Sequence, residues 1–200
     1  DVLLCFGNDE EVFGTGARSI VDVLRERSIR PSLVLDEGGA IVREIFPGVD
    51  EDYAVIGVTE KGITTLRLRV DEHGGHAASP PAFAATERLS RAILRLNRRP
   101  SKARLGTTTR TMIRTLGSRA RQPLRTVFAA VDVLSPLLTR VFVRRGAETA
   151  ALTRTTRAVT ELRAGHAHNA LAESAEATLN VRIAPWSSVE EAVEEVRRAI

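Results

Sequence analysis

The stretch LRLRVD, residues 66–71, alternates strictly between apolar and charged side chains. A period of two places Leu66, Leu68 and Val70 on one face of a β-strand and the charged side chains on the other. One apolar face and one wet face are typical of an antiparallel sheet that is covered on one side only. The stretch therefore predicts a half-covered sheet, and the segments around it decide which helices cover it.

The segments that follow predict a β-α-β-β-α order. Apolar residues recur at helical spacing from Leu89 to Leu96, which predicts a helix after the first strand. Residues 155–163 and 174–183 have the pattern of two further strands. Ser188 then stands at the N-cap position of a final amphipathic helix. This order predicts a ferredoxin-like α+β sandwich without its last strand.

A basic insert at residues 98–150 interrupts this sandwich. Residues 98–147 hold twelve Lys or Arg residues and one acid, Asp132, although the whole chain has a net charge of +4. Residues 122–143 are expected to be helical, with Pro136 as a break or kink. We favour a solvated helical elaboration. Contact with an anionic lipid surface or with acyl chains comes second, and nucleic acid comes last, because few aromatic side chains are present to stack on bases.

Upstream of the alternating stretch, the sequence predicts a parallel βαβ unit. Residues 2–6 form a continuous apolar run, as in a buried parallel strand. Apolar residues between 17 and 24 have the spacing of a helix face, and residues 33–35 form a second apolar run. Strand, helix and strand within about 35 residues match the length of a right-handed βαβ unit. Residues 53–58 predict one more strand.

Composition limits the class of protein further. The 43% hydrophobic content supports a packed core, and the single cysteine excludes an internal disulfide framework. Cys5 lies within an apolar run, so we expect a small core residue rather than a nucleophile. No secretory signal and no 18-residue apolar run is visible, which favours a cytoplasmic location. Because the chain opens on Asp1 without a Met, we expect a piece of a longer protein.

Acidic residues follow the first expected strand and end the second. Asp9, Glu10 and Glu11 are adjacent, and Asp36 comes at the end of the second apolar run. Because parallel strands end at the same edge of a sheet, we expect these carboxylates to lie close together. Such a group could bind zinc, and a neighbouring carboxylate could deprotonate a metal-bound water. The alternative is that the acids cap the helix that starts near Gly16.

Two weaker patterns in the sequence suggest other ligands. His166 and His168 are two residues apart on an expected strand, so they could share a face and bind a metal, although exposed histidines at a strand end are the simpler interpretation. The segment Gly14–Gly16 faintly resembles a phosphate-binding loop. It lacks the Lys-Ser/Thr that such a loop carries, and the acidic neighbours would repel a phosphate.

Five blocks of the sequence resemble one known family, in the family's order. They are FGNDEEVFGTGA (6–17), SLVLDEGGAIV (32–42), VTEKGITTLRLRV (58–70), HGGHAASPP (73–81) and HNALAESAEATLNVRIAP (168–185). The family is that of the zinc-dependent exopeptidases and amidohydrolases, which includes carboxypeptidase S, aminoacylase, glutamate carboxypeptidase and succinyl-diaminopimelate desuccinylase. The branch of carboxypeptidase S and the N-acyl-amino-acid hydrolases resembles the chain most.

The resemblance implies roles for individual residues. In the catalytic domain, Glu10 resembles the general base, Glu11 a ligand of one zinc ion and Asp36 a ligand of the other. Three residues of the lid domain are also implicated, one in catalysis and two in holding the substrate. These are His76, which would support the oxyanion in the partner subunit's site, and Asn169 and Arg182, which would hold the substrate, Arg182 by a free carboxylate.

The resemblance also implies an architecture and a set of partners. Residues 1–62 would be an α/β catalytic-domain fragment and residues 63–200 a lid and dimerisation domain. The complete protein would be a homodimer that binds two zinc ions and cleaves a small peptide or an N-acyl-amino acid, with no nucleic-acid partner. The remaining ligands are expected outside this chain, so the isolated chain is expected to be inactive. The alternative is a non-catalytic module for dimerisation or for binding an anionic surface.

Overall fold

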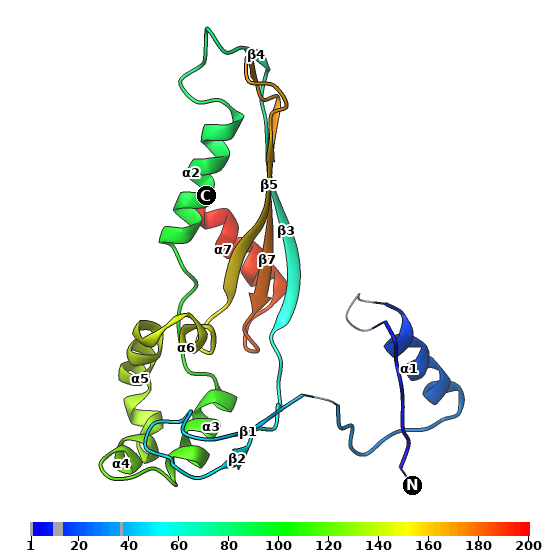
Figure 1. The fold of residues 1–200 in the computed structure, drawn as a ribbon, viewed down its shortest axis with the longest axis vertical. Coiled ribbons are helices and arrows are strands. Elements are labelled where there is room, and N and C mark those ends of the chain that lie inside the picture. The colour runs from blue at the N-terminus through cyan, green and yellow to red at the C-terminus, as the bar shows by residue number, and fades with distance from the viewer. Residues whose placement is uncertain (1, 10–13, 37) are drawn as a thin grey trace. The chain divides into compact units, whose positions relative to one another are not determined.

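The computed structural model describes residues 2–9, 14–36 and 38–200. The chain forms two compact units, Asp1–Gly38 and Gly39–Ile200, and each is described by itself (Figure 1). None of the helices in the described part of the chain has the length and apolar content needed to span a membrane.

The first unit contains one helix, α1 (Gly16–Glu26), which confirms the helix predicted there. The strands predicted at 2–6 and 33–35 are not formed, so the predicted parallel βαβ unit is wrong for this structure. A strand needs a neighbour for its backbone N–H and C=O groups, and no described segment pairs with either run. Both runs are exposed, and so is Cys5, which was predicted to lie in a core.

The second unit is built on a three-stranded antiparallel sheet. Its strands are β3 (Gly62–Asp71), β5 (Thr156–Ala164) and β7 (Ser174–Ile183), in the order β3-β7-β5. The strand that comes last in the chain therefore lies between the other two, as in a split βαβ unit. A short ribbon of β4 (Gly75–His76) and β6 (Ala170–Leu171) continues from one end of the sheet.

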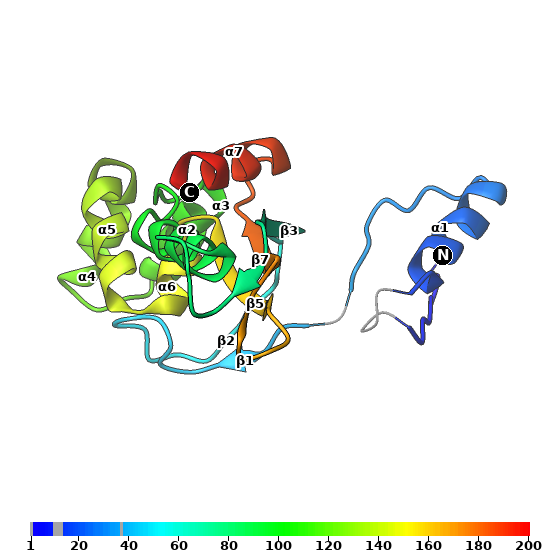
Figure 2. The ribbon, with the colours of Figure 1, turned by 90° about the horizontal axis from the view of Figure 1, so that it is seen from above.

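Two helices cover one face of this sheet, α2 (Ala85–Arg98) and α7 (Val189–Ala199) (Figure 2). The inward residues of β7 alternate along the strand and are buried beneath these helices. Leu66, Leu68 and Val70 pack against the same core, as their alternation predicted. The predicted ferredoxin-like β-α-β-β-α order is confirmed, including the cap of the last helix, where the Glu191 N–H donates to the Ser188 hydroxyl at 3.2 Å.

The insert forms a separate helical cluster with its own core. Its helices are α3 (Thr107–Gly117), α4 (Leu124–Ala129), α5 (Val131–Arg145) and α6 (Ala147–Ala151). They pack against the segment that carries β1 (Ile41–Val42) and β2 (Tyr53–Ala54), an antiparallel pair.

Two sequence predictions about this cluster are corrected by the structure. The helix predicted at 122–143 changes direction at Ala130, whereas Pro136 lies inside α5. The turn at Ala130 lets Phe128 and Val131, which belong to different helices, enter the same core. The strand predicted at 53–58 is limited to Tyr53–Ala54.

Candidate functional site

The structure describes only some residues of the acidic cluster predicted from the sequence. Glu10 and Glu11 lie outside the described residues, and Asp36 is exposed in the extended segment that follows α1. The described residues contain no group of three or more His, Cys, Asp or Glu side chains that could hold a metal ion. The carboxylates that are visible therefore do not form a complete metal site.

Asp9 caps helix α1, as the alternative interpretation of the acidic run predicted. Its two carboxylate oxygens accept from the Gly16 N–H at 3.1 and 3.2 Å, and its backbone carbonyl accepts from the Gly14 N–H at 2.8 Å. A Cβ atom on Gly14 would lie 2.0 Å from an Asp9 carboxylate oxygen, and one on Gly16 would lie 2.3 Å away. Both glycines therefore make room for this carboxylate.

His76 and Asn169 lie side by side on the β4–β6 ribbon. His76 pairs with Ala170, and the Ala77 N–H donates to the Asn169 carbonyl at 3.0 Å. The Ala78 N–H donates to Nδ1 of His76 at 3.1 Å. Because Nδ1 accepts this bond, the neutral imidazole carries its proton on Nε2 and can donate it to a ligand.

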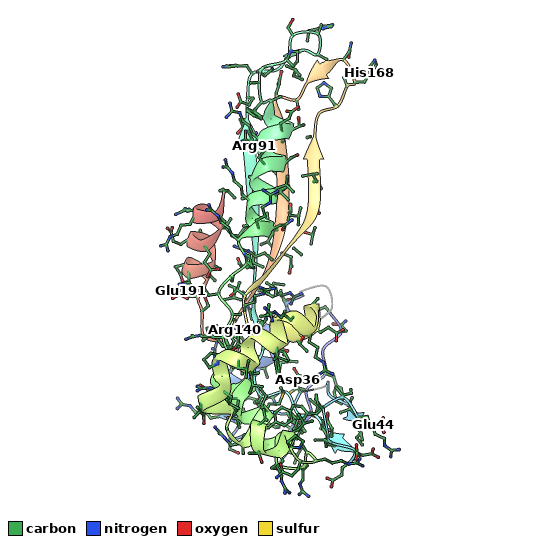
Figure 3. The ribbon with its side chains drawn as sticks, turned by 90° about the vertical axis from the view of Figure 1, so that its left-hand side faces the viewer. Asp36, Glu44, Arg91, Arg140, His168 and Glu191 are labelled. Carbon is green, nitrogen blue, oxygen red and sulfur yellow. The ribbon has the colours of Figure 1, made fainter. Side chains whose placement is uncertain are left out.

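The neighbouring histidines are not on a strand. His166 and His168 lie in the loop of residues 165–169, between β5 and β6, at the same end of the sheet as the ribbon (Figure 3). Gly165 has a φ of 59°, which lets the chain leave β5. The prediction that these two histidines share a strand face is therefore wrong.

Arg182 lies at the other end of the sheet. It pairs with Ile63 of β3 and Thr156 of β5, whereas the ribbon joins the sheet at the Ser174 end of β7. Eight residues of extended strand correspond to roughly 27 Å between Arg182 and Ser174. The structure therefore brings His76 and Asn169 together and places Arg182 far from both.

The guanidinium of Arg182 is positioned by a residue that the sequence analysis missed. Its Nε donates to the Asn180 side-chain oxygen at 3.1 Å, and within the described part of the chain it has no ion-pair partner. Asn180 is two residues before Arg182, so the period of two along β7 was the signal for a shared face. An arginine that is oriented but unpaired can bind a carboxylate with its terminal nitrogens.

Further cations lie at this end of the sheet. The Lys61 ammonium donates to the Arg154 carbonyl at 2.7 Å, which ties the start of β3 to the residues before β5. Burial, and then the charge of Arg154, lower the pKa of Lys61. The concentration of positive charge favours an anionic ligand near Arg182.

The edge of the sheet formed by β5 is apolar. Val159 and Leu162 of β5 pair with Leu179 and Ala177, which are buried beneath the helices. Paired residues share a face, so Val159 and Leu162 extend the same apolar layer. Leu162 is nevertheless 62% exposed, because α2 and α7 cover mainly β7 and β3 and leave the outer part of β5 open.

Comparison with known proteins assigns this arrangement to a family. A family model described as "Peptidase dimerisation domain" matches residues 58–200, which include the whole sheet, both covering helices and the insert. The chain belongs to the M20 peptidase family. The resemblance noted in the sequence is therefore confirmed.

Relatives within the M20 family match along almost the whole chain. Human "N-fatty-acyl-amino acid synthase/hydrolase PM20D1" is 34% identical over 96% of this chain and 38% of its own length. The Dictyostelium discoideum "Probable carboxypeptidase S-like 2" is 33% identical over 100% of this chain and 38% of its own. Zebrafish PM20D1.1 is 36% identical over 88% of this chain and 35% of its own. The chain thus spans less than two-fifths of the length of these curated relatives.

Proposed function

We propose that this chain is the lid, with part of the catalytic domain, of a homodimeric zinc-dependent hydrolase. The complete protein cleaves a peptide or N-acyl-amino-acid amide bond next to a free carboxylate. The observation that carries this proposal is the match over 96% of the chain to a human protein named as an N-fatty-acyl-amino acid synthase and hydrolase. A cytoplasmic location stays a prediction.

Glu11 and Asp36 are the residues of this chain that would bind zinc. Carboxylate oxygens are ordinary zinc ligands, but two carboxylates are too few for a two-metal site, so the other ligands must come from elsewhere in the complete protein. The exposed apolar runs 2–6 and 33–35 support this view, because pairing with further strands would cover them and place both acids at one sheet edge. Zinc held by these residues would supply a Lewis acid that polarises the substrate carbonyl and acidifies a bound water. Glu10 would take the proton from that water and pass it to the leaving amine.

The open edge of β5 supports dimerisation. In a complete ferredoxin-like sandwich the fourth strand lies beside the first, which here is β3, and β5 remains an edge. Unpaired backbone groups and the exposed side chains of Val159 and Leu162 then lie on one continuous surface. If a second copy related by a two-fold axis paired along β5, its backbone would bond these unpaired groups and its side chains would cover Val159 and Leu162. Such an interface is self-complementary.

The distance between Arg182 and the pair of His76 and Asn169 favours the view that they serve two different active sites of a dimer. Arg182 would hold the substrate carboxylate in the site of its own subunit. His76 and Asn169, at the far end of the sheet, would reach the site of the partner subunit. There the Nε2–H of His76 would support the developing oxyanion, because Nδ1 is already occupied by the Ala78 N–H.

Substitution of Glu10 tests the catalytic part of the proposal. In the full-length protein we expect Glu10→Ala to lower turnover by at least about 100-fold, because the general base is lost. Zinc content, measured by mass spectrometry of the metal, should not change. The matched variant Glu11→Ala should lose zinc together with activity. Full activity in Glu10→Ala would refute its assignment as the base.

A further inference from the structure

The outer face of helix α5 carries an exposed apolar stripe. Val133, Leu137 and Val141 are 82%, 54% and 46% exposed, and they recur every four residues. This spacing places them one above the other along the helix. The opposite side of α5, with Val131 and Leu138, is buried in the core of the insert. The stripe is therefore a second apolar face of a helix whose first face is already packed.

Arginines without partners flank this stripe. Arg140 and Arg144 lie beside it, Arg145 follows Val141 by four residues at its C-terminal end, and none of the three has an ion pair within the described ranges. Other arginines of the insert are paired. Arg110 and Arg114 contact Asp132, Arg119 contacts Glu51, and Arg121 contacts Asp50. Three of the insert's cations without an ion pair in the described part of the chain therefore lie on α5, next to the stripe.

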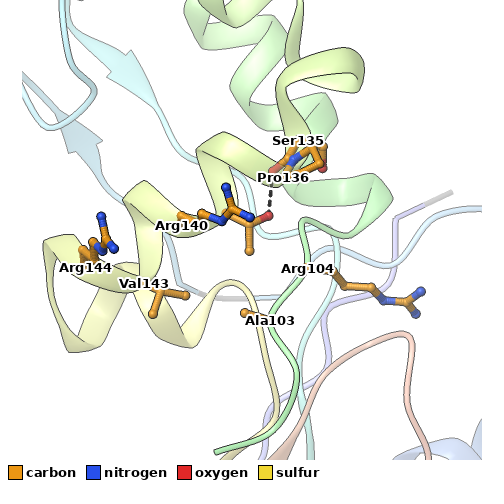
Figure 4. A pocket seen from close by; sticks show the side chains of 8 residues that line it. Ala103, Arg104, Ser135, Pro136, Arg140, Val143 and Arg144 are labelled. Atoms are coloured by element: carbon orange, nitrogen blue, oxygen red, sulfur yellow. Dashed lines mark hydrogen bonds between the residues drawn. The ribbon is translucent and has the colours of Figure 1, made fainter.

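A groove runs beside the stripe between α5 and the segment that precedes α3. It has a volume of about 450 Å³, with Val143, Pro136 and Ala103 among its lining residues (Figure 4). Arg140 and Arg144 of α5 also line it, whereas the guanidinium of Arg104, another lining residue, stacks on the Trp186 ring. An apolar surface bordered by cations suits a molecule with an anionic group joined to a hydrocarbon part.

We propose that α5 docks the protein on an anionic lipid bilayer. The stripe enters the boundary between headgroups and acyl chains, and Arg140, Arg144 and Arg145 contact the lipid phosphates. An interfacial helix combines an apolar face with flanking arginines in this way. The inference does not depend on the proposed hydrolase activity.

Other occupants of this surface fit less well. A two-fold contact between copies of the chain would cover the stripe, but the only acid it would offer the three arginines is Asp132 of the partner helix, which is already paired with Arg110 and Arg114. A nucleic acid would satisfy the arginines but not Val133, Leu137 and Val141, and the exposed face of α5 offers no aromatic side chain for stacking.

Vesicle co-sedimentation of the chain tests the proposal. We expect binding to phosphatidylcholine vesicles that contain phosphatidylglycerol, weaker binding at high salt, and little binding to pure phosphatidylcholine. Arg140→Gln/Arg144→Gln/Arg145→Gln should lower the partition coefficient on the order of 100-fold, at roughly fivefold per arginine. The control triple variant Arg18→Gln/Arg27→Gln/Arg30→Gln removes the same charge from the first unit and should bind like the wild type.

A fluorescent label shows which face binds. With Cys5 replaced by Ser, an environment-sensitive dye on Leu137→Cys should shift to shorter wavelength with anionic vesicles, whereas the same dye on Thr65→Cys of β3 should not. No binding by the wild type, equal losses in both triple variants, or no shift at Leu137 would each overturn the proposal. Binding to polyglutamate but not to vesicles would also overturn it, in favour of an acidic protein partner.

Discussion

At the scale of single residues, the members of the acidic run Asp9, Glu10 and Glu11 are assigned different roles. The Asp9 carboxylate caps the N-terminus of α1, where it accepts a hydrogen bond from the Gly16 N–H. A carboxylate at this position satisfies a backbone donor that has no partner within the helix and lies near the positive end of the helix dipole.

The substitution Gly14→Ala tests this role of Asp9. The added Cβ would lie 2.1 Å from the Asp9 carboxylate carbon, so the side chain must leave its place. We expect the first turn of α1 to lose about 1 kcal/mol of stability, as for the loss of a helix cap. Faster amide hydrogen exchange at residues 16–19 would measure it.

Gly7→Ala is the matched control, because nothing lies within 4 Å of a Cβ atom built on Gly7. It should leave the exchange rates unchanged. Equal rates in Gly14→Ala and in the wild type would show that Asp9 does not cap α1 in solution.

Some residues of the candidate site could be predicted from sequence and others could not. The motif that contains His76 predicted its importance, but only the structure shows that Ala78 occupies Nδ1 and that Asn169 is adjacent. Asn180 was overlooked because no motif marks it. The roles of Glu10, Glu11 and Asp36 stay predictions.

At the scale of elements, the antiparallel sheet was predictable because its signal is local. β3 and β7 carry a period of two, which the bulge between Val159 and Glu161 interrupts in β5, and each covering helix carries a period of 3.6, so most of the burial is visible in each element's own sequence. The runs 2–6 and 33–35 are different. Continuous apolar runs indicate burial on both faces, which depends on neighbours that the described part of the chain does not supply. For the same reason, the turn at Ala130 could not be predicted, since it depends on the core shared by α4 and α5.

The edge strand β5 gives a prediction about assembly. Leu162→Lys would place a charge in the apolar layer at the open edge, so we expect the dimer dissociation constant to rise on the order of 10-fold or more. Analytical ultracentrifugation over a concentration series measures the change. The control is Val189→Lys on α7, a residue that is similarly apolar and partly exposed but lies away from this edge.

A wild-type chain that stays monomeric at all concentrations would contradict dimerisation through this domain. If both lysine variants weakened the dimer equally, the interface would involve α7 rather than β5.

At the scale of the whole molecule, the proposed function depends on the length of the lid. Arg182 and the pair of His76 and Asn169 are at opposite ends of β7 and its ribbon. A single small substrate could not contact both ends of one lid. A symmetric dimer resolves this difficulty, because each active site would combine Arg182 from one subunit with His76 and Asn169 from the other.

Mixed dimers of two inactive variants test this claim most directly. His76→Ala and Arg182→Ala, made in the full-length protein, should each lose most of their activity when assayed alone. After the two are unfolded and refolded together, half of the dimers are mixed, and each mixed dimer regains one intact site. We predict recovery of about one quarter of wild-type turnover. If the refolded mixture, shown to contain mixed dimers, stays as inactive as its components, His76 and Arg182 do not come from different subunits, and the account is contradicted.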